Sequence, residues 1–345
     1  MDSYEEFVAL VRARVDGWLE SWLGDRVARA SERGADVATV ADALRRLVLR
    51  GGKRLRAVLL AASYEACGGD RRNGEGIVTA AGASLELLQA YLLVHDDFMD
   101  GDDVRRGGPS VPAVMRERFG HDGDAASVVA GDLACAWSQS ALLDVDVDPA
   151  HLVLAARELA RAQEEVVAGQ MLDVRGDASD GAEVEAVHAL KTASYTTRAP
   201  LAIGARLAGA REAQVAALAA FARPLGVAFQ LRDDVLGTFG HERTMGKPSG
   251  GDLRKGKRTA LVVEAMPDPK AWGSVARVLG RPEATAAEVN DAIAELEACG
   301  ARARVEARIA TLQRAAQAAL DRAELTAAGR GLLASAVVAM TDRER

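Results

Sequence analysis

Residues 91–109, which read YLLVHDDFMDGDDVRRGGP, decide what kind of protein this is. An apolar run ends in three carboxylates, Asp96, Asp97 and Asp100, and Arg105 and Arg106 follow shortly after. On a helix of about 3.6 residues per turn, Asp96 and Asp100 share one face and Asp97 lies beside them.

These three carboxylates repel one another and lose hydration at the end of an apolar helix unless cations join them. Mg²⁺ suits the position because it takes oxygen ligands and often shares them with a phosphate. The arginine pair offers fork-shaped donors that match phosphate oxygens. The segment therefore predicts metal ligands and anion ligands side by side. From this stretch alone, the alternative is a solvated acidic helix end with a salt-bridged turn.

A second acidic helix end lies far along the chain. Residues 229–237 read FQLRDDVLG and contain Gln230, Asp233 and Asp234. The basic, glycine-rich stretch 245–259, MGKPSGGDLRKGKRT, follows. Two acidic helix ends, each followed by a basic loop, predict two walls of one diphosphate-binding site.

Composition favours a helical core. The 345 residues are 49% hydrophobic but only 4% aromatic, and no β-branched alternation is sustained. We expect one all-α domain over residues 1–345, a bundle of packed helices. The three cysteines, Cys67, Cys135 and Cys299, are widely spaced, which indicates a reducing compartment and argues against a disulfide frame or a zinc site.

Charge and hydropathy set further expectations. The N-terminus is acidic, and no uncharged apolar run reaches the roughly 18 residues of a membrane span, so we expect a cytoplasmic chain without stable membrane insertion. The net charge of −7 argues weakly against nucleic acid as a partner.

Apolar periodicity and glycine or proline breaks outline the helices. They are expected over 4–23, 39–50, 53–66, 76–100, 112–119, 124–144, 149–175, 181–209 and 211–236, and then over 258–341 with breaks near Pro267, Pro269, Gly280, Pro282, Gly300 and Gly329. Pro200 should kink its helix. The loop 237–257 holds six glycines and is long enough to suggest a functional lid.

Other polar residues lie at suggestive spacings. Lys53 and Arg56 are three apart where a helix opens, so they should share a face at an N-terminus that favours anions, although a solvent-facing basic patch is as good a reading. Gln89 lies two turns before Asp96, as either a core hydrogen-bonding group or a ligand contact. Gln170 is cofacial with Asp173.

Together these segments resemble the trans (E-type) polyprenyl diphosphate synthases, most of all those that make geranylgeranyl diphosphate. The resemblance covers roughly residues 50–260. It rests on GGKRLR at 51–56, HDDFMD at 95–100, RRG at 105–107, GQMLD at 169–173, KT at 191–192, QLRDD at 230–234 and GKPSG at 246–250.

The resemblance implies an all-α isoprenoid synthase bundle of type I, with the active-site cavity in its core. It also implies that the enzyme condenses isopentenyl diphosphate with an allylic diphosphate. It implies three Mg²⁺ ions held by Asp96, Asp100 and Asp233, with Asp97 and Asp234 in support. Substrate contacts follow from the motifs: for isopentenyl diphosphate Lys53, Arg56, Gln89 and Arg106; for the allylic diphosphate Arg105, Lys191, Thr192, Gln230, Lys247 and Lys257; and for substrate more generally Gln170. Gly237 stands where many relatives have a third aspartate, so the metal geometry there is open.

The resemblance also implies a homodimer and a product length. An aromatic residue five places before Asp96, here Tyr91, with non-aromatic Leu92 after it, resembles the geranylgeranyl pattern. On a straight helix Tyr91 points roughly 140° away from Asp96, so core packing is an alternative role for it.

Three other functions are alternatives. A farnesyl diphosphate synthase differs only in product length. A class I terpene cyclase would carry a different second metal motif, which Asn290–Asp291 fails to complete because Ala294 and Ala298 follow. A non-catalytic partner subunit would have no need of intact acidic and basic motifs.

Overall fold

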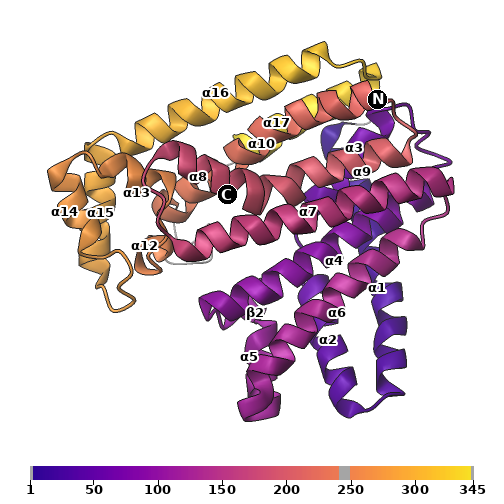
Figure 1. The fold of residues 1–345 in the computed structure, drawn as a ribbon, viewed down its shortest axis with the longest axis horizontal. Helices are drawn as coiled ribbons and strands as arrows, with labels where there is room; N and C mark the ends of the chain where they lie inside the picture. The colour runs from indigo at the N-terminus through magenta and orange to yellow at the C-terminus, as the bar shows by residue number, and fades with distance from the viewer. Residues whose placement is uncertain (1–2, 241–248, 343–345) are drawn as a thin grey trace. The chain divides into compact units, whose positions relative to one another are not determined.

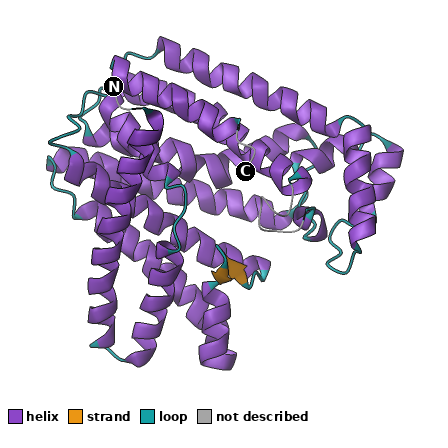
Figure 2. Ribbon diagram, turned by 180° about the vertical axis from the view of Figure 1, so that it is seen from behind, coloured by secondary structure: helices purple, strands orange, loops and turns teal. Residues whose placement is uncertain are grey.

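The computed structural model describes residues 3–240 and 249–342, and these are almost entirely helical (Figure 2). The all-α prediction is confirmed. Within the described residues the strands form one small antiparallel hairpin, β1 (Val104–Arg105) with β2 (Gly108–Pro109), in which Arg105 pairs with Gly108. It forms at the arginine turn, which the sequence patterns do not identify as a strand.

Backbone contacts divide the chain into two compact units. The first contains the residues up to Leu159 together with Pro200–Arg211 and Leu325–Gly329, and the second contains Ala160–Ala199, Glu212–Glu324 and the residues from Arg330 onward. The prediction of a single domain stays a prediction.

The first unit is built on α4, which packs most extensively on α6 and then on α3 and α1 (Figure 1). Its helices are α1 (Tyr4–Ser31), α2 (Ala35–Leu49), α3 (Leu55–Ala66), α4 (Glu75–Asp100), α5 (Val111–Phe119), the 3-10 turn η1 (Gly120–Asp122) and α6 (Gly123–Leu143). Small residues let α4 approach its neighbours: Ser84 on α4 donates to the Ser138 carbonyl of α6 at 2.7 Å. Helix α4 ends at Asp100 because Gly101 takes a left-handed conformation, φ 67°.

The second unit is built on α10 (Glu212–Phe239), which packs on α16 (Ala301–Arg322) and on η2 (Ala189–Arg198). Its remaining helices are α8 (Gly181–His188), α12 (Gly251–Arg254), α13 (Ala260–Ala265), α14 (Pro269–Ala276) and α15 (Ala286–Ala298). Three helices are divided between the units: α7 (Pro149–Arg175), α9 (Ala199–Leu207) and α17 (Ala327–Thr341).

Several predicted boundaries were wrong. Helix α1 continues to Ser31 instead of stopping at residue 23, because the residues beyond Gly24 are mostly good helix formers. The predicted helix 181–209 is α8, η2 and α9 in succession, and η2 is a π-helix. The irregularity therefore precedes Pro200, whose ring would clash with the carbonyl four residues back in an α-helix.

Gly329 was predicted to break the last helix, but it lies inside α17. A Cβ at Gly329 would collide with the backbone of Ala66, so this glycine permits close packing within the first unit. The true break is at residues 323–326, before α17 begins.

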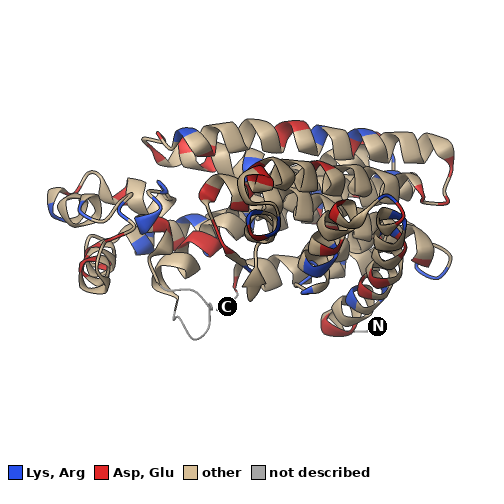
Figure 3. Ribbon diagram, turned by 90° about the horizontal axis from the view of Figure 1, so that it is seen from below, with Lys and Arg blue, Asp and Glu red and all other residues tan. Residues whose placement is uncertain are grey.

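Two helices, α4 and α10, are long and apolar enough to cross a membrane by length and composition. In the protein 67% of the apolar window of α4 and 50% of that of α10 are buried. Along the helices acidic and basic residues are interspersed (Figure 3).

Candidate active site

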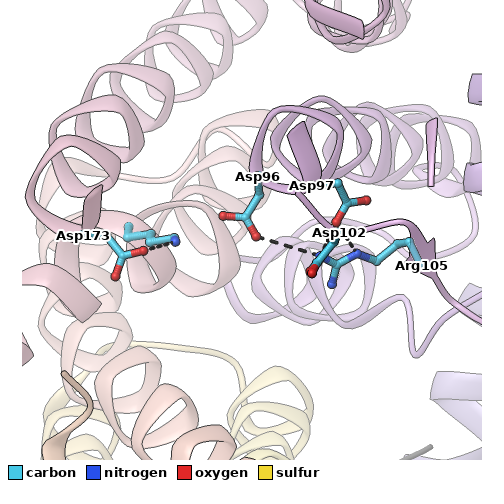
Figure 4. Close-up of polar contacts among 6 residues, drawn as sticks. Asp96, Asp97, Asp102, Arg105 and Asp173 are labelled. Atoms are coloured by element: carbon cyan, nitrogen blue, oxygen red, sulfur yellow. Dashed lines mark hydrogen bonds and ion pairs between the residues drawn. The ribbon is translucent and has the colours of Figure 1, made fainter. Parts of the chain in front are cut away.

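The first acidic cluster lies on the last turn of α4, and Arg105 of β1 reaches back to it (Figure 4). Asp97 is fully buried, and its Oδ1 accepts from Arg105 Nε at 2.7 Å and also from Arg105 Nη2. Arg105 Nη2 lies 3.3 Å from Asp102 Oδ2 and 3.9 Å from Asp96 Oδ2. The turn is thus salt-bridged, as the alternative of a solvated acidic helix end also expects, but its central carboxylate is buried and not solvated.

Burial governs the protonation of this carboxylate. Burial raises the pKa of Asp97, and the opposing effect of Arg105 does not cancel the shift. Asp97 Oδ2 has no hydrogen-bond partner among the residues that the structure describes. The helix C-terminus adds a negative dipole at the same place. The last turn of α4 is therefore a site where positive charge is favoured.

Asp96 and Asp100 are half-buried and one helical turn apart, as predicted. Their position on an unbroken helix gives them a common face, whereas Asp97 faces Arg105 and the interior. The structure thus separates two outward carboxylates from one that anchors an arginine.

A basic corner lies on the other side of the same turn. Arg106, at φ 51°, donates from Nη2 to Gln89 Oε1 at 3.1 Å. The position of a Cβ on Gly52 would be 3.6 Å from Arg106 Nη2, so the 51–56 motif lies against this arginine. Arg56 is buried and Lys53 is exposed. The structure therefore brings Arg106 and Gln89 together beside the 51–56 motif, which contains Lys53 and Arg56.

The common helical face predicted for Lys53 and Arg56 was wrong. Helix α3 begins at Leu55, so Lys53 precedes it and does not share a helical face with Arg56. The cause is Arg54, which caps α3 in the left-handed conformation, φ 50° and ψ 35°. A side chain with a Cβ adopts this conformation rarely.

In the second unit, the motifs of α7 and η2 meet. Lys191 Nζ donates to Asp173 Oδ2 at 2.5 Å (Figure 4). A Cβ at Gly169 would collide with the backbone of Lys191, which explains the glycine that opens this motif. Gln170, three residues before Asp173, and Thr192, directly after Lys191, are both half-buried.

The second acidic cluster, on α10, also contains one buried carboxylate. Asp234 accepts from Gln230 Nε2 at 3.1 Å and is 5% exposed, while Asp233 is half-buried. Burial, followed by the charge of Asp252, raises the pKa of Asp234 well above its usual range. Lys257 opposes that shift with its own charge. Lys247 lies outside the described residues.

Sequence patterns missed two residues here. His188 Nε2 lies 3.4 Å from Asp234 Oδ2, and burial lowers the pKa of His188 to about 4. Asp252 Oδ2 lies 3.0 Å from the position that a Cβ on Gly237 would occupy. A carboxylate thus reaches the space left by the missing third aspartate. The one sequence signal that could have indicated Asp252 is that it is the single acidic residue in the basic stretch 251–258.

Tyr91 lies on the α6 side of α4. Its ring meets His95 edge-on, with centroids 5.0 Å apart. Burial, then Cys135 and Asp132 of α6, raise its pKa. Leu92 is half-buried. The role of these two residues in product length stays a prediction.

Comparison with known proteins gives one consistent result. The polyprenyl synthetase family model matches residues 37–296. The chain is 34% identical over 262 residues to the geranylgeranyl diphosphate synthase of Methanosarcina mazei, covering 75% of this chain and 76% of that one. It is 33% identical over 256 residues to the short chain isoprenyl diphosphate synthase of Methanocaldococcus jannaschii, covering 73% and 74%.

Among solved structures, the geranylgeranyl pyrophosphate synthase of Corynebacterium glutamicum, complexed with isoprenyl diphosphate and magnesium, superposes with a TM-score of 0.90 at 32% identity. The match covers 99% of this chain and 100% of that one. With a family model over more than half of its length and relatives of this similarity, this chain belongs to the polyprenyl synthetase family.

Proposed function

We propose that this chain is a Mg²⁺-dependent prenyltransferase that condenses isopentenyl diphosphate with an allylic diphosphate, with geranylgeranyl diphosphate as the main product. The observation that carries the proposal is the turn after α4. The two adjacent arginines there contact different groups. Arg105 donates to Asp97 of the acidic cluster, whereas Arg106 donates to Gln89 beside the 51–56 motif. Its relatives named above support the same reaction.

The donor set fits Mg²⁺ only as a partial shell. Within 3–240 and 249–342, no group of three His, Cys, Asp or Glu side chains is gathered closely enough to hold a metal ion. Mg²⁺ is commonly bound through one or two carboxylates, with water and substrate phosphate completing six oxygens. Asp96, Asp100 and Asp233, all half-buried, suit that mode.

We assign Asp97 and Asp234 to support of those ligands, and we propose three ions. Mg²⁺, when bound, supplies positive charge that stabilises the departing diphosphate.

The residues of the basic corner bind isopentenyl diphosphate. Arg56, Arg106 and Lys53 supply positive charge, and Gln89 orients Arg106 through its amide oxygen. Because Arg106 is already hydrogen-bonded, little reorganisation is needed when the substrate arrives. Arg105, on the other half of the turn, is assigned to the allylic diphosphate.

Bond cleavage demands that negative charge be stabilised in place. The allylic C–O bond breaks, its electron pair stays on the diphosphate, and the allylic cation is attacked by the double bond of isopentenyl diphosphate. The diphosphate that has left accepts the proton released in the last step. Water must be excluded, because it would capture the cation. We assign the allylic diphosphate to Arg105, Lys191, Thr192, Gln230, Lys247 and Lys257, and Gln170 to substrate contact.

We further propose a homodimer, a cytoplasmic location and Tyr91 as the residue that limits chain length. A farnesyl product is the alternative outcome for length.

The deciding experiment is incubation of the purified chain with isopentenyl diphosphate, an allylic diphosphate and Mg²⁺, followed by sizing of the products. We expect a twenty-carbon diphosphate, and no product after EDTA treatment. Full turnover in metal-free buffer would contradict the metal assignment. A hydrocarbon formed from the allylic substrate alone would show a cyclase, and no reaction with any primer would overturn the proposal.

A further inference from the structure

Glu86 is a buried carboxylate on α4 to which the reaction chemistry assigns no role. It is 3% exposed and lies one turn before Gln89 on the same helix. Its Oε2 accepts from Arg54 Nη1 at 3.0 Å. Its Oε1 has no hydrogen-bond partner among the residues that the structure describes. Burial of a carboxylate with one unpaired oxygen costs free energy unless nearby positive charges compensate it.

One group that Glu86 holds is Arg54. The Arg54 guanidinium also donates to Asp16 Oδ1 at 2.7 Å and to the Val48 carbonyl at 2.8 Å, so it is fixed on three sides. This residue takes the left-handed conformation that turns the chain into α3. The positions of Lys53 and Arg56, one residue before and two residues after it, therefore depend on the anchoring of Arg54.

The other group is Arg106. Its guanidinium is hydrogen-bonded to Gln89 and lies beside Gly52. Burial, together with the charges of Arg54, Arg56 and Arg105, lowers the pKa of Arg106, and the charge of Glu86 opposes that shift. Asp16, the second partner of Arg54, has a side chain 40% exposed and is screened by water, whereas that of Glu86 is 2% exposed.

We propose that Glu86 is a positioning residue of the isopentenyl diphosphate site. Its single carboxylate holds Arg54 in the turn that places Lys53 and Arg56, and its charge keeps Arg106 in place among like charges. This inference rests on the proposed function. A purely structural Glu86, present only to neutralise Arg54, is the reading it must exclude.

The test compares Glu86→Gln with Asp16→Asn. Both substitutions keep the side-chain shape, and both remove one carboxylate from Arg54, but only the first removes the charge near Arg106. For Glu86→Gln we expect KM for isopentenyl diphosphate to rise tenfold or more, with KM for the allylic substrate and kcat changed less than twofold. For Asp16→Asn we expect all three within twofold of the unaltered chain.

Binding gives a readout that does not depend on turnover. Isopentenyl diphosphate alone, titrated calorimetrically into the full chain, should bind Glu86→Gln about tenfold more weakly. In an Arg106→Gln background, the added Glu86→Gln substitution should weaken binding by much less, because the group it acts on is gone.

Each outcome decides a different point. Glu86→Gln with unchanged KM and binding, or with the same small effect as Asp16→Asn, overturns the inference while the proposed function stands. An unaltered chain that neither binds nor elongates isopentenyl diphosphate overturns both. If Glu86→Gln does not fold, Arg54→Gly/Glu86→Gln replaces it, since glycine accepts the left-handed conformation. That variant should again raise KM, and an unchanged KM would sink the idea.

Discussion

Replacing His188 by glutamine should remove a pH-dependent loss of stability from this protein. Burial lowers the pKa of His188 from 6.5 to about 4, so between these values the folded chain binds fewer protons than the unfolded chain. The free energy of unfolding is therefore highest above pH 6.5 and falls as the pH falls towards 4. Glutamine does not titrate, so the variant lacks this contribution.

The size of the effect follows from the shift. From the two pKa values, protonation of His188 should cost about 2 kcal/mol between pH 7 and pH 5, and about 3 kcal/mol by pH 4. Asp234, whose raised pKa has the opposite effect, is present in both chains, so its main contribution cancels in the comparison.

The assay is urea unfolding of both chains at pH 7, 6, 5 and 4.5. The unaltered chain should lose about 2 kcal/mol more than His188→Gln between pH 7 and pH 5. His121→Gln is the control, since the side chain of His121 is 92% exposed, and it should follow the unaltered chain. A difference between the unaltered chain and His188→Gln that is the same at pH 7 and pH 5 would refute the reasoning.

Three other substitutions test the site. Asp96→Ala should lower kcat at least a hundredfold while leaving urea stability unchanged or higher, because a repelling carboxylate is removed; a normal rate with lowered stability would point to a structural role. Tyr91→Ala should lengthen the products, as seen by chromatography of the dephosphorylated alcohols; an unchanged product distribution from an active variant excludes it as the limit. Gly237→Ala should raise urea stability by about 1 kcal/mol or less, provided that the Asp252 carboxylate rotates away; a loss of stability would show that Asp252 is fixed.

Sequence alone determined the features that depend on local periodicity. The bounds of α7 were predicted without error, and those of α4 to within one residue. The shared face of Asp96 and Asp100 followed from the same spacing, because a helical turn relates residues four apart wherever the helix lies. The opposite directions of Arg105 and Arg106 could likewise be expected from their adjacency.

The tertiary structure decided which charges are buried. The spacing places Asp97 beside the face of Asp96 and Asp100, but it does not say which of these carboxylates is buried; in the structure Asp97 is fully buried and holds Arg105. The left-handed turn at Arg54 was likewise invisible, and it moved Lys53 off the helix that was expected to carry it.

The remaining surprises are pairs distant in sequence. Arg54 and Glu86 are 32 residues apart, and His188 lies against Asp234 from a different helix. Sequence patterns register the local backbone preference of each residue, whereas the burial of a charge depends on which helices pack over it. A buried charge needs its partner from that packing, and so the identity of the partner is set only when the helices come together.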